Sequence, residues 1–285
     1  MITKSNSIFY TIILGIGKTG FYSAYLYNTY GIFLKILDTR NIICKLKTIK
    51  HILSNDTKYF IGNNIFNSII LKNAIKIVLS PGLSINKYPI NRILDLAKIN
   101  NIEIISEIEI FSRLLYDLNK NGYKPIILAV TGTNGKTTVT KIIFYMMKYS
   151  KKIVSIAGNV NPATLLVLIK CMKKNFFPEI FVIELSSFQL KYTKSILPFA
   201  STILNLNKDH IDWHKIELDY IKSKKRIYRN SRNILFNQDD KNLKKNFFNV
   251  KNSKIKKFSK DINEYLSDIG LLKEQKKKIY CNYKK

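Results

Sequence analysis

One segment near the middle of the chain, Ala129–Thr138 with the sequence A-V-T-G-T-N-G-K-T-T, sets a glycine-rich turn between an apolar run and a helical pattern. The apolar run Ile126–Val130 predicts a buried strand, and a helix is expected to begin at Thr137. Gly132 and Gly135 let the backbone turn with its N–H groups pointing inward, where they can hold a phosphate at the helix N-terminus. A strand, a phosphate-binding turn and a helix in this order indicate an α/β fold with a parallel sheet.

The side chains of this turn add to its predicted affinity for phosphate. Lys136 can place a positive charge beside the β- and γ-phosphates of a nucleotide, and the Thr137 hydroxyl can ligate Mg²⁺. The usual spacing G-x-x-x-x-G-K-[ST] is not met, since Val130 stands at the position of the first glycine. A structural glycine turn with one solvated lysine is the alternative, but the flanking strand and helix favour nucleotide binding. The predicted ATP-binding residues are Gly132, Thr133, Asn134, Gly135, Lys136, Thr137 and Thr138.

The composition predicts a folded protein with room for two domains. The chain has 285 residues, of which 46% are hydrophobic, enough to build two cores. A net charge of +29, from 48 Lys and Arg against 19 Asp and Glu, raises the alternative of a basic nucleic-acid-binding protein. The lysines are mostly spread along a chain that is also rich in Ile and Asn, and only the C-terminal tail concentrates them. We therefore expect neither a nucleic acid nor a membrane as partner.

The cysteines and the N-terminal segment indicate a cytoplasmic protein. Cys44, Cys171 and Cys281 have no metal-ligand spacing and are odd in number, so a disulfide framework is not expected. The longest N-terminal apolar run, Ile8–Ile16, is short for a membrane span and lacks a small-residue cleavage site. We interpret this run as a strand.

Short apolar runs alternate with helical patterns along most of the chain, as in a parallel sheet covered by helices. Turn-forming and charged residues gather in Asn119–Pro125, and we place a domain boundary there, between residues 1–119 and 120–285. The pattern fades into lysine and asparagine after Phe236. The predicted strands are Phe9–Leu14, Ile32–Leu37, Ile75–Leu79, Glu103–Ile105, Ile126–Val130, Ile153–Ile156, Ile180–Ile183 and Thr202–Leu206. The predicted helices are Thr19–Tyr30, Ile90–Ile99, Glu107–Leu118, Thr137–Tyr149, Ala163–Met172 and Leu218–Arg229.

Three turns follow predicted strands in the first domain. Gly15–Gly20, with the sequence G-I-G-K-T-G, opens a helix, so its backbone can approach a diphosphate. Asp38–Arg40 ends the second strand, where ribose or base contacts fall in such sheets, and Ser80–Gly82 ends the third. A nicotinamide dehydrogenase would use the first two features, but nothing in the chain supplies a convincing site for hydride transfer.

Two strand ends in the second domain bring polar residues to the edge of the predicted phosphate-binding turn. Glu184 ends the buried strand of F-V-I-E-L-S-S-F-Q-L, where a carboxylate can hold Mg²⁺ against bound phosphates. A buried carboxylate without a partner would otherwise be costly. The next strand leads into N-L-N-K-D-H-I-D, in which His210 shares its segment with Asp209 and Asp212. A metal-ligand role and a structural role both stay open for His210.

Taken together, G-T-N-G-K-T-T, E-L-S-S-F-Q-L and N-L-N-K-D-H-I-D resemble the Mur ligase family, and E-L-S-S-F-Q-L resembles its D-glutamate-adding members most. G-I-G-K-T-G, D-T-R and S-P-G are similar to the N-terminal domain of the same members, and the matches fall in order between Ile8 and Tyr228. The resemblance implies an α/β fold with a Rossmann-like first domain that binds a UDP-sugar, followed by a P-loop-type central ATPase domain.

The resemblance implies an ATP- and Mg²⁺-dependent ligase of peptidoglycan precursor synthesis. ATP would phosphorylate the alanyl carboxylate of UDP-N-acetylmuramoyl-L-alanine, and the amine of D-glutamate would attack the acyl phosphate to form an amide. The catalytic residues implied are Lys136, Glu184, His210 and Lys224. The metal-binding residues implied are Thr137, Glu184, His210 and, if it is carbamylated, Lys224. The residues implied to contact the UDP-substrate are Lys18, Thr19, Asp38, Thr39, Arg40, Gly82 and Asn159.

The chain departs from the family's pattern in two places. Asn161 stands in the loop Ala157–Pro162 where the family has a glycine, so the shape of this loop is not carried over. Family members also continue into a third, Rossmann-like domain that binds the incoming amino acid, and the resemblance ends before it. We therefore expect an incomplete central domain, no third domain, and little amide formation by the isolated chain. A split enzyme with a separately encoded C-terminal domain and a relic that binds UDP-sugar or ATP without ligation both stay open.

Overall fold

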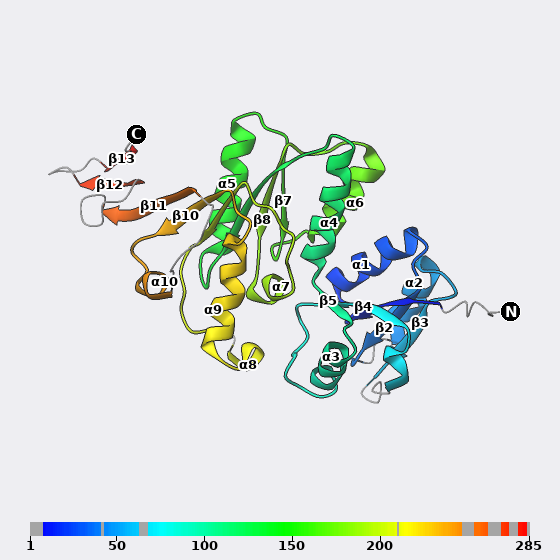
Figure 1. The fold of residues 1–285 in the computed structure, drawn as a ribbon. Coiled ribbons are helices and arrows are strands. Elements are labelled where there is room, and N and C mark those ends of the chain that lie inside the picture. The colour runs from blue at the N-terminus through cyan, green and yellow to red at the C-terminus, as the bar shows by residue number, and fades with distance from the viewer. Residues whose placement is uncertain are drawn as a thin grey trace. The chain divides into compact units, whose positions relative to one another are not determined.

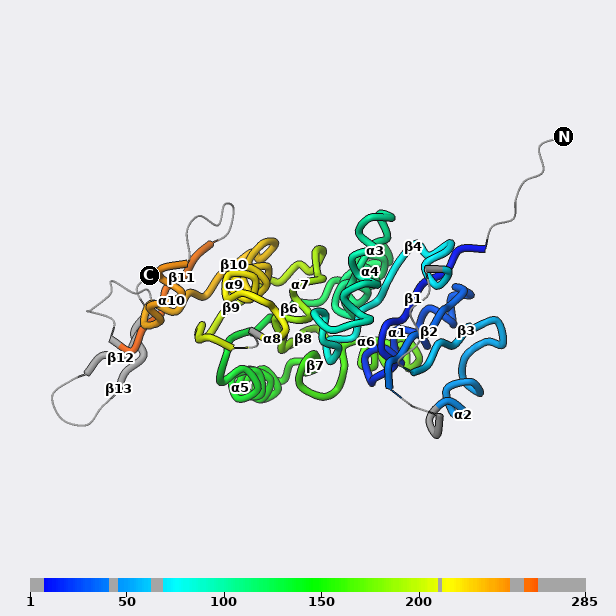
Figure 2. The backbone as a smooth tube through the Cα atoms, turned by 90° about the horizontal axis from the view of Figure 1, so that it is seen from below, coloured from blue at the N-terminus to red at the C-terminus, as the bar shows by residue number. Residues whose placement is uncertain are grey.

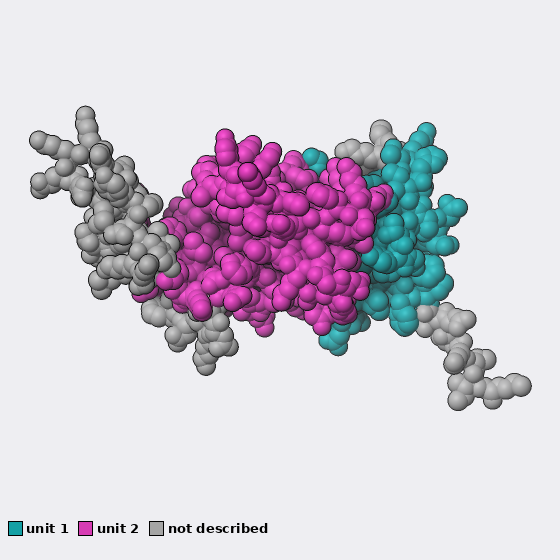
Figure 3. Space-filling model, turned by 90° about the horizontal axis from the view of Figure 1, so that it is seen from above, with its two compact units in different colours: residues 1–111 teal, residues 112–285 magenta. Residues whose placement is uncertain are grey.

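The computed structural model describes residues 8–40, 43–62, 68–209, 211–246, 254–261, 269–273 and 279–283. The chain divides into two compact units, unit 1 (residues 1–111) and unit 2 (residues 112–285), which are coloured separately in Figure 3. The division falls inside the helix α4 (Glu107–Lys120), and the boundary predicted from the sequence falls at the C-terminal end of the same helix. None of the helices in the described ranges has the length and apolar character that crossing a membrane requires.

Unit 1 is built around a five-stranded parallel sheet in the order β3-β2-β1-β4-β5. Its strands are β1 (Tyr10–Leu14), β2 (Leu34–Asp38), β3 (Lys58–Ile61), β4 (Ala74–Leu79) and β5 (Glu103–Ile105). Its helices are α1 (Lys18–Thr29), α2 (Ile43–Ile52), the 3₁₀ helix η1 (Ser68–Leu71), α3 (Ile90–Ile99) and the start of α4. All residues of β1 and β2 are buried, as expected for central strands with helices on both faces. The strand order reverses between β1 and β4, which is the position where open α/β sheets bind ligands.

Unit 2 contains a second sheet, in the order β13-β12-β11-β10-β9-β6-β8-β7, in which only β12 and β13 pair antiparallel. Its strands are β6 (Ile126–Thr131), β7 (Val154–Gly158), β8 (Ile180–Glu184), β9 (Ala200–Ile203), β10 (Asn233–Asn237), β11 (Lys254–Asp261), β12 (Ile269–Lys273) and β13 (Ile279–Tyr283). Its helices after α4 are α5 (Lys136–Tyr149), α6 (Thr164–Lys174), α7 (Ser187–Lys191), α8 (Ile211–His214), α9 (Glu217–Lys225), the 3₁₀ helix η2 (Arg226–Tyr228) and α10 (Lys241–Asn246). Figure 1 shows this sequence of elements.

The strand order of unit 2 brings the ends of four strands to one edge. β6 lies between β8 and β9, and β7 lies beyond β8. The register aligns Val130 of β6 with Glu184 of β8, and Glu184 with Gly158 of β7. Connections between parallel strands are right-handed, so helices that lead toward opposite edges of the sheet cover opposite faces of it. Figure 2 shows this for α5 and α9, which lie on opposite sides of the strands. The carboxyl ends of these strands therefore share one crevice.

The two-sheet α/β architecture confirms the fold class predicted from the sequence. The strand that follows β8 is shorter than predicted: β9 ends at Ile203, and residues 204–206 continue as irregular backbone. The structure adds elements that the apolar pattern did not indicate: α2, β3 and η1 in unit 1, and α7, α8, β10, α10 and β11 to β13 in unit 2.

Candidate functional site

The predicted phosphate-binding turn joins the C-terminal end of β6 to α5, and we call residues Gly132–Gly135 the cradle. Gly135 occupies the left-handed region with φ +78° and caps α5 at its N-terminus. A left-handed residue at this point favours glycine, because a Cβ would strain the backbone. A Cβ on Gly132 would lie 3.1 Å from the Leu204 Cβ, so the cradle also packs tightly against the segment after β9. The cradle thus leads directly into a helix N-terminus, which attracts anions.

Two side chains from elsewhere in unit 2 hold the cradle in shape. The Asn205 Oδ1 accepts hydrogen bonds from the N–H groups of Thr133 (3.0 Å) and Asn134 (2.8 Å), and its Nδ2 donates to the Asn134 carbonyl (3.1 Å). The Tyr220 hydroxyl lies 2.8 Å from the Thr133 Oγ1. Asn205 thus takes two of the four cradle N–H groups, and the first-turn N–H groups of α5 are further backbone donors that can face a phosphate. Neither Asn205 nor Tyr220 was singled out from the sequence, although Asn205 opens the quoted segment N-L-N-K-D-H-I-D.

The three polar residues at the start of α5 face different partners. The Lys136 Nζ donates to the Thr133 carbonyl at 2.7 Å, so the ammonium lies over the cradle. The Thr137 Oγ1 donates to the Glu184 Oε2 at 2.7 Å, which links the first turn of α5 to the end of β8. Thr138 follows in the same turn and is exposed. The structure therefore brings Lys136, Thr137 and Glu184 to one place, as the sequence suggested.

Glu184 is the buried carboxylate of this edge, with 1% of the residue exposed. Its Oε1 accepts from the Asn159 Nδ2 at 2.8 Å, and its main-chain carbonyl accepts from the Asn159 N–H at 2.8 Å. Gly158, next to Asn159, has φ +112°, and a Cβ there would lie 2.1 Å from the Glu184 carbonyl oxygen, so only glycine fits. The donors to the Glu184 carboxylate are thus an amide and a hydroxyl, and a cation is the partner that would compensate its buried charge best.

Lys224 reaches the cradle from α9 and is 2% exposed. Its Nζ donates to the Gly132 carbonyl at 2.7 Å and to the Thr131 Oγ1 at 3.3 Å. Burial, with a further contribution from the positive charge of Lys136, lowers the pKa of Lys224 from 10.5 to about 7. A large fraction of this amine is therefore neutral at neutral pH, in contrast to an ordinary surface lysine.

The donor set at this edge matches Mg²⁺ better than a transition metal. One carboxylate and one threonine hydroxyl meet here beside a phosphate-binding turn, and Mg²⁺ typically takes one or two carboxylates together with water and phosphate oxygens. Within the described ranges, no group of three or more His, Cys, Asp and Glu side chains is close enough to hold a metal ion. His210, which is also among the predicted metal ligands, lies outside the described residues.

A partly buried network of hydrogen bonds beside the cradle joins α7, α8 and α9. The His214 Nε2 lies 2.9 Å from the Ser187 Oγ, and its Nδ1 lies 3.2 Å from the Asp219 Oδ2, which also accepts from the Lys191 ammonium. Burial alone would raise the pKa of Asp219, but the hydrogen bonds from Lys191 and His214 outweigh it and hold this pKa below its usual range. Because Ser187 opens α7 three residues after Glu184, the network ties the end of β8 to the helix that carries Lys224.

In unit 1, the three predicted strand-end turns are joined by hydrogen bonds. The Ser80 Oγ donates to the Gly15 carbonyl at 2.6 Å, and the Ile16 N–H donates to the Asp38 Oδ2 at 2.9 Å. A Cβ on Gly20 would lie 1.9 Å from the Gly15 carbonyl oxygen, so α1 approaches the turn as closely as glycine allows. The ends of β1, β2 and β4 thus form one crevice at the reversal of strand order.

The Asp38 carboxylate is occupied by protein donors. Its side chain is fully buried and accepts from the Ile16 N–H, the Arg40 N–H (3.0 Å), and the Arg40 Nε (2.9 Å) and Nη2 (2.7 Å). Burial would raise the pKa of Asp38, but the hydrogen bonds from Arg40 and Ile16 together hold it below its usual range. Arg40, whose side chain is 59% exposed, is held by this carboxylate.

The remaining residues predicted to contact the UDP-substrate lie around the same turns. Lys18 and Thr19 form the first turn of α1, after the capping residue Gly17. Thr39 follows β2 and Gly82 lies in the turn after β4. The structure brings these residues together in unit 1, whereas Asn159, predicted for the same substrate, lies in unit 2 against Glu184.

The comparisons with known proteins agree with this two-part description. Residues 10–106 match the family model of the Mur ligase MurD-like N-terminal domain, and residues 130–283 match that of the Mur ligase middle domain. The chain is 35% identical over 263 residues to the UDP-N-acetylmuramoylalanine--D-glutamate ligase of Bordetella pertussis, covering 91% of the chain and 52% of the relative. The enzyme with the same name from Cupriavidus metallidurans is 36% identical over 220 residues, covering 77% and 43%. The chain thus spans about half the length of these relatives.

Solved structures show likeness of fold. A UDP-N-acetylmuramate:L-alanyl-gamma-D-glutamyl-meso-diaminopimelate ligase from Neisseria meningitides superimposes with a TM-score of 0.54 at 16% identity, over 94% of this chain and 82% of the other. At this identity, the superposition speaks for the fold alone.

Proposed function

Because the chain belongs to the Mur ligase family, we propose that it supplies the UDP-sugar-binding and ATP-binding parts of an enzyme that joins D-glutamate to UDP-N-acetylmuramoyl-L-alanine in peptidoglycan precursor synthesis. The names of its relatives from Bordetella and Cupriavidus support this choice of substrates. The observation that carries the proposal is the contact of Thr137 with the buried Glu184 beside the Lys136 ammonium.

The proposed reaction proceeds through an acyl phosphate. The alanyl carboxylate attacks the γ-phosphorus of ATP and ADP leaves; the amine of D-glutamate then attacks the acyl carbon, and inorganic phosphate leaves as the amide forms. Lys136 and the first-turn N–H groups of α5 would hold the phosphates and neutralise charge that develops on them. Thr137 and Glu184 would hold Mg²⁺, which supplies Lewis-acid polarisation of the phosphoryl oxygens when it is bound. The chain's part is therefore positioning and charge compensation rather than covalent catalysis.

We assign a second acidic group to the site through Lys224. A neutral amine can add to CO₂, forming an N–C bond and releasing one proton, and the product is a carbamate with one negative charge. The lowered pKa of Lys224 favours the neutral amine that this step needs. The carbamate would be a ligand for a second Mg²⁺, and His210 is the proposed further ligand beside the acyl phosphate. Asn159 would orient the substrate from its place on Glu184.

The crevice of unit 1 is the proposed site for the uridine diphosphate group. The N-terminus of α1, with Lys18 and Thr19, would face the diphosphate. Arg40 and Thr39 would face the uridine, and Gly82 would let the turn after β4 approach it closely. Asp38, whose oxygens already accept from Ile16 and Arg40, would act by holding Arg40 in place. We assign this role to the first domain, residues 1–119, assign ATP to residues 120–285, and place the activity in the cytoplasm.

Nucleotide titration of matched variants tests the ATP site. Lys136→Ala should weaken binding of Mg-ATP by about tenfold or more, because it removes a charge-assisted contact where helix N–H groups already gather phosphate. Lys148→Ala, an exposed position in the last turn of the same helix, should change the affinity little. Glu184→Ala should be partly rescued by a higher Mg²⁺ concentration, since its effect passes through the metal. Equal effects of the two lysine substitutions would reduce the site to a generic basic surface.

A further inference from the structure

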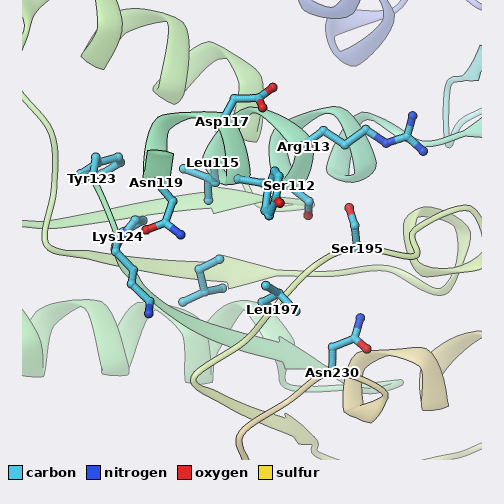
Figure 4. Close-up of a pocket in the computed structure, with 13 residues that line it drawn as sticks. Ser112, Arg113, Leu115, Asp117, Asn119, Tyr123, Lys124, Ser195, Leu197 and Asn230 are labelled. Carbon is cyan, nitrogen blue, oxygen red and sulfur yellow. The ribbon is translucent and has the colours of Figure 1, made fainter. Parts of the chain in front are cut away.

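A second hollow in unit 2 lies away from the cradle, at the other end of β6. It has a volume of about 600 Å³ and is bordered by the C-terminal half of α4, the segment that leads into β6 and the loop after α7 (Figure 4). Ile127, the second residue of β6, lines it, whereas the cradle begins after Thr131. At about 3.3 Å per residue, the two sites are separated by roughly 15 Å along the strand. The volume lies within the usual range of small-molecule sites.

The pocket has an apolar floor and an exposed rim. Ser112, Leu115 and Ile127 form the floor and are each 6% or 7% exposed. Tyr116 and Leu197 stand at the rim and are both 62% exposed. A buried apolar floor below exposed apolar groups favours a flat, apolar ligand body that enters from the rim.

The Ser112 hydroxyl on the floor is a hydrogen-bond donor that a ligand could satisfy. The Ser112 Oγ is buried and finds no hydrogen-bond partner within the part of the chain that the structure describes. Ser112 lines the pocket, and Figure 4 shows it between Leu115 and Ser195. A buried hydroxyl without a partner is unfavourable by a few kcal/mol, and an acceptor atom at the inner end of a ligand would remove that cost.

The charge at the rim selects the outer end of the ligand. Lys124 lines the pocket and is exposed. Asp117, the one acidic residue among those that line it, extends away from the interior in Figure 4 and forms an ion pair with Lys120 at 2.7 Å. Asp117 therefore leaves the positive charge at the rim largely uncompensated, which favours a ligand with an anionic outer end.

We propose that this pocket binds a flat aromatic carboxylate that carries a hydroxyl or carbonyl oxygen at the end opposite the carboxylate. The ring lies against Leu115 and Ile127, the inner oxygen accepts from the Ser112 hydroxyl, and the carboxylate faces Lys124. This site is separate from the proposed ATP and UDP-sugar sites, and its test does not depend on whether those two assignments are correct.

Three related probes separate the contributions of the two polar contacts. The full chain is titrated with 6-hydroxy-2-naphthoate, with 2-naphthoate, which lacks the inner oxygen, and with 6-hydroxy-2-naphthamide, which lacks the charge, and binding is followed by the fluorescence anisotropy of the ring. Ser112→Ala should weaken 6-hydroxy-2-naphthoate about fivefold and leave 2-naphthoate unchanged, because one hydrogen bond is lost only for the former. Lys124→Gln should weaken both carboxylates and leave the amide unchanged.

A blocking substitution provides the spatial control. Leu197→Trp at the rim should abolish binding of all three probes, whereas Leu218→Trp, at an exposed position of α9 that does not line the pocket, should leave their affinities unchanged. Thermal unfolding of each variant verifies that it is folded. The proposal is overturned if 6-hydroxy-2-naphthoate fails to bind the folded chain, if Ser112→Ala affects both naphthoates equally, or if the two tryptophan variants behave alike.

Discussion

The neutral state of Lys224 makes the stability of unit 2 depend on pH in a direction opposite to that of an ordinary salt-bridged lysine. Its pKa is about 7 in the folded protein and 10.5 for a free side chain. Below pH 7 the amine is protonated in both states, and the folded state bears the full unfavourable effect of burying the charge. As the pH rises above 7, the folded protein releases the proton first, so the free energy of unfolding increases with pH up to about 10.5.

The size of this effect follows from the pKa difference. Each pH unit between the two pKa values contributes about 1 kcal/mol or a little more, so the total change between pH 6 and pH 9 is roughly 2–3 kcal/mol. Lys224→Met keeps most of the side-chain volume and removes the titration. We therefore expect the free energy of unfolding of the wild-type chain, relative to this variant, to rise by roughly 2–3 kcal/mol over this range.

Urea unfolding in CO₂-free buffer measures this difference. Trp213, the one tryptophan of the chain, is buried in unit 2 next to α9, so its fluorescence reports the unfolding of that unit. Other titrating groups are common to both proteins and cancel in the difference. Below pH 6 the difference should become constant, which is the internal control. If the two unfolding curves keep the same separation from pH 6 to pH 9, Lys224 keeps its proton in the folded state and our account of its environment is wrong.

Three further predictions concern the residues that shape the two sites. Gly20→Ala should destabilise unit 1 by about 2 kcal/mol or more, because its Cβ would collide with the Gly15 carbonyl oxygen, while Gly17→Ala, where a Cβ meets no atom within 4 Å, should be tolerated; thermal unfolding compares them, and similar losses would contradict the close approach. His214→Phe should lower the free energy of unfolding by about 2–3 kcal/mol, and adding Ser187→Ala should recover part of it in urea titrations, because the serine hydroxyl then no longer stays buried without its partner. Asn205→Ala should weaken Mg-ATP binding severalfold in calorimetry without a matching loss of stability, since it frees the cradle backbone; unchanged affinity would show that the Asn205 contacts are dispensable.

The central strands could be predicted from the sequence because strands that are buried on both faces consist of continuous runs of apolar residues. β1 and β8 are buried along their whole length and match the predicted strands to within a residue. β11, with the sequence K-I-K-K-F-S-K-D, was missed because lysines interrupt its apolar positions, while its pairing with β10 depends on backbone hydrogen bonds that any sequence can form. Side-chain pattern therefore identifies the centre of a sheet better than its periphery.

The candidate site could be located from the sequence, but its internal contacts could not. Parallel strands deliver their carboxyl ends to one edge, so the neighbourhood of Lys136 and Glu184 followed from topology. The hydrogen bond from the Asn134 N–H to the Asn205 side chain joins residues 71 positions apart in the sequence, and no local sequence pattern indicates such a contact. Similarly, the sequence placed Asp38 at a ligand-binding turn but could not show that Ile16 and Arg40 take up its oxygens.

Val130, Glu184 and Gly158 lie in one row across β6, β8 and β7. The hydrogen bonds between these strands, rather than the loops, therefore set the distances between residues of the site. A slip of β8 by one residue would move Glu184 by about 3.3 Å and turn its side chain to the other face of the sheet. A longer loop at the opposite edge of the sheet leaves this row of residues intact. Deleting a single residue inside β8 would instead abolish the function of the site, even in a protein that could still fold. The strand register thus fixes the geometry of the site, and the tolerance of its function to insertions and deletions should change abruptly where a loop becomes a strand.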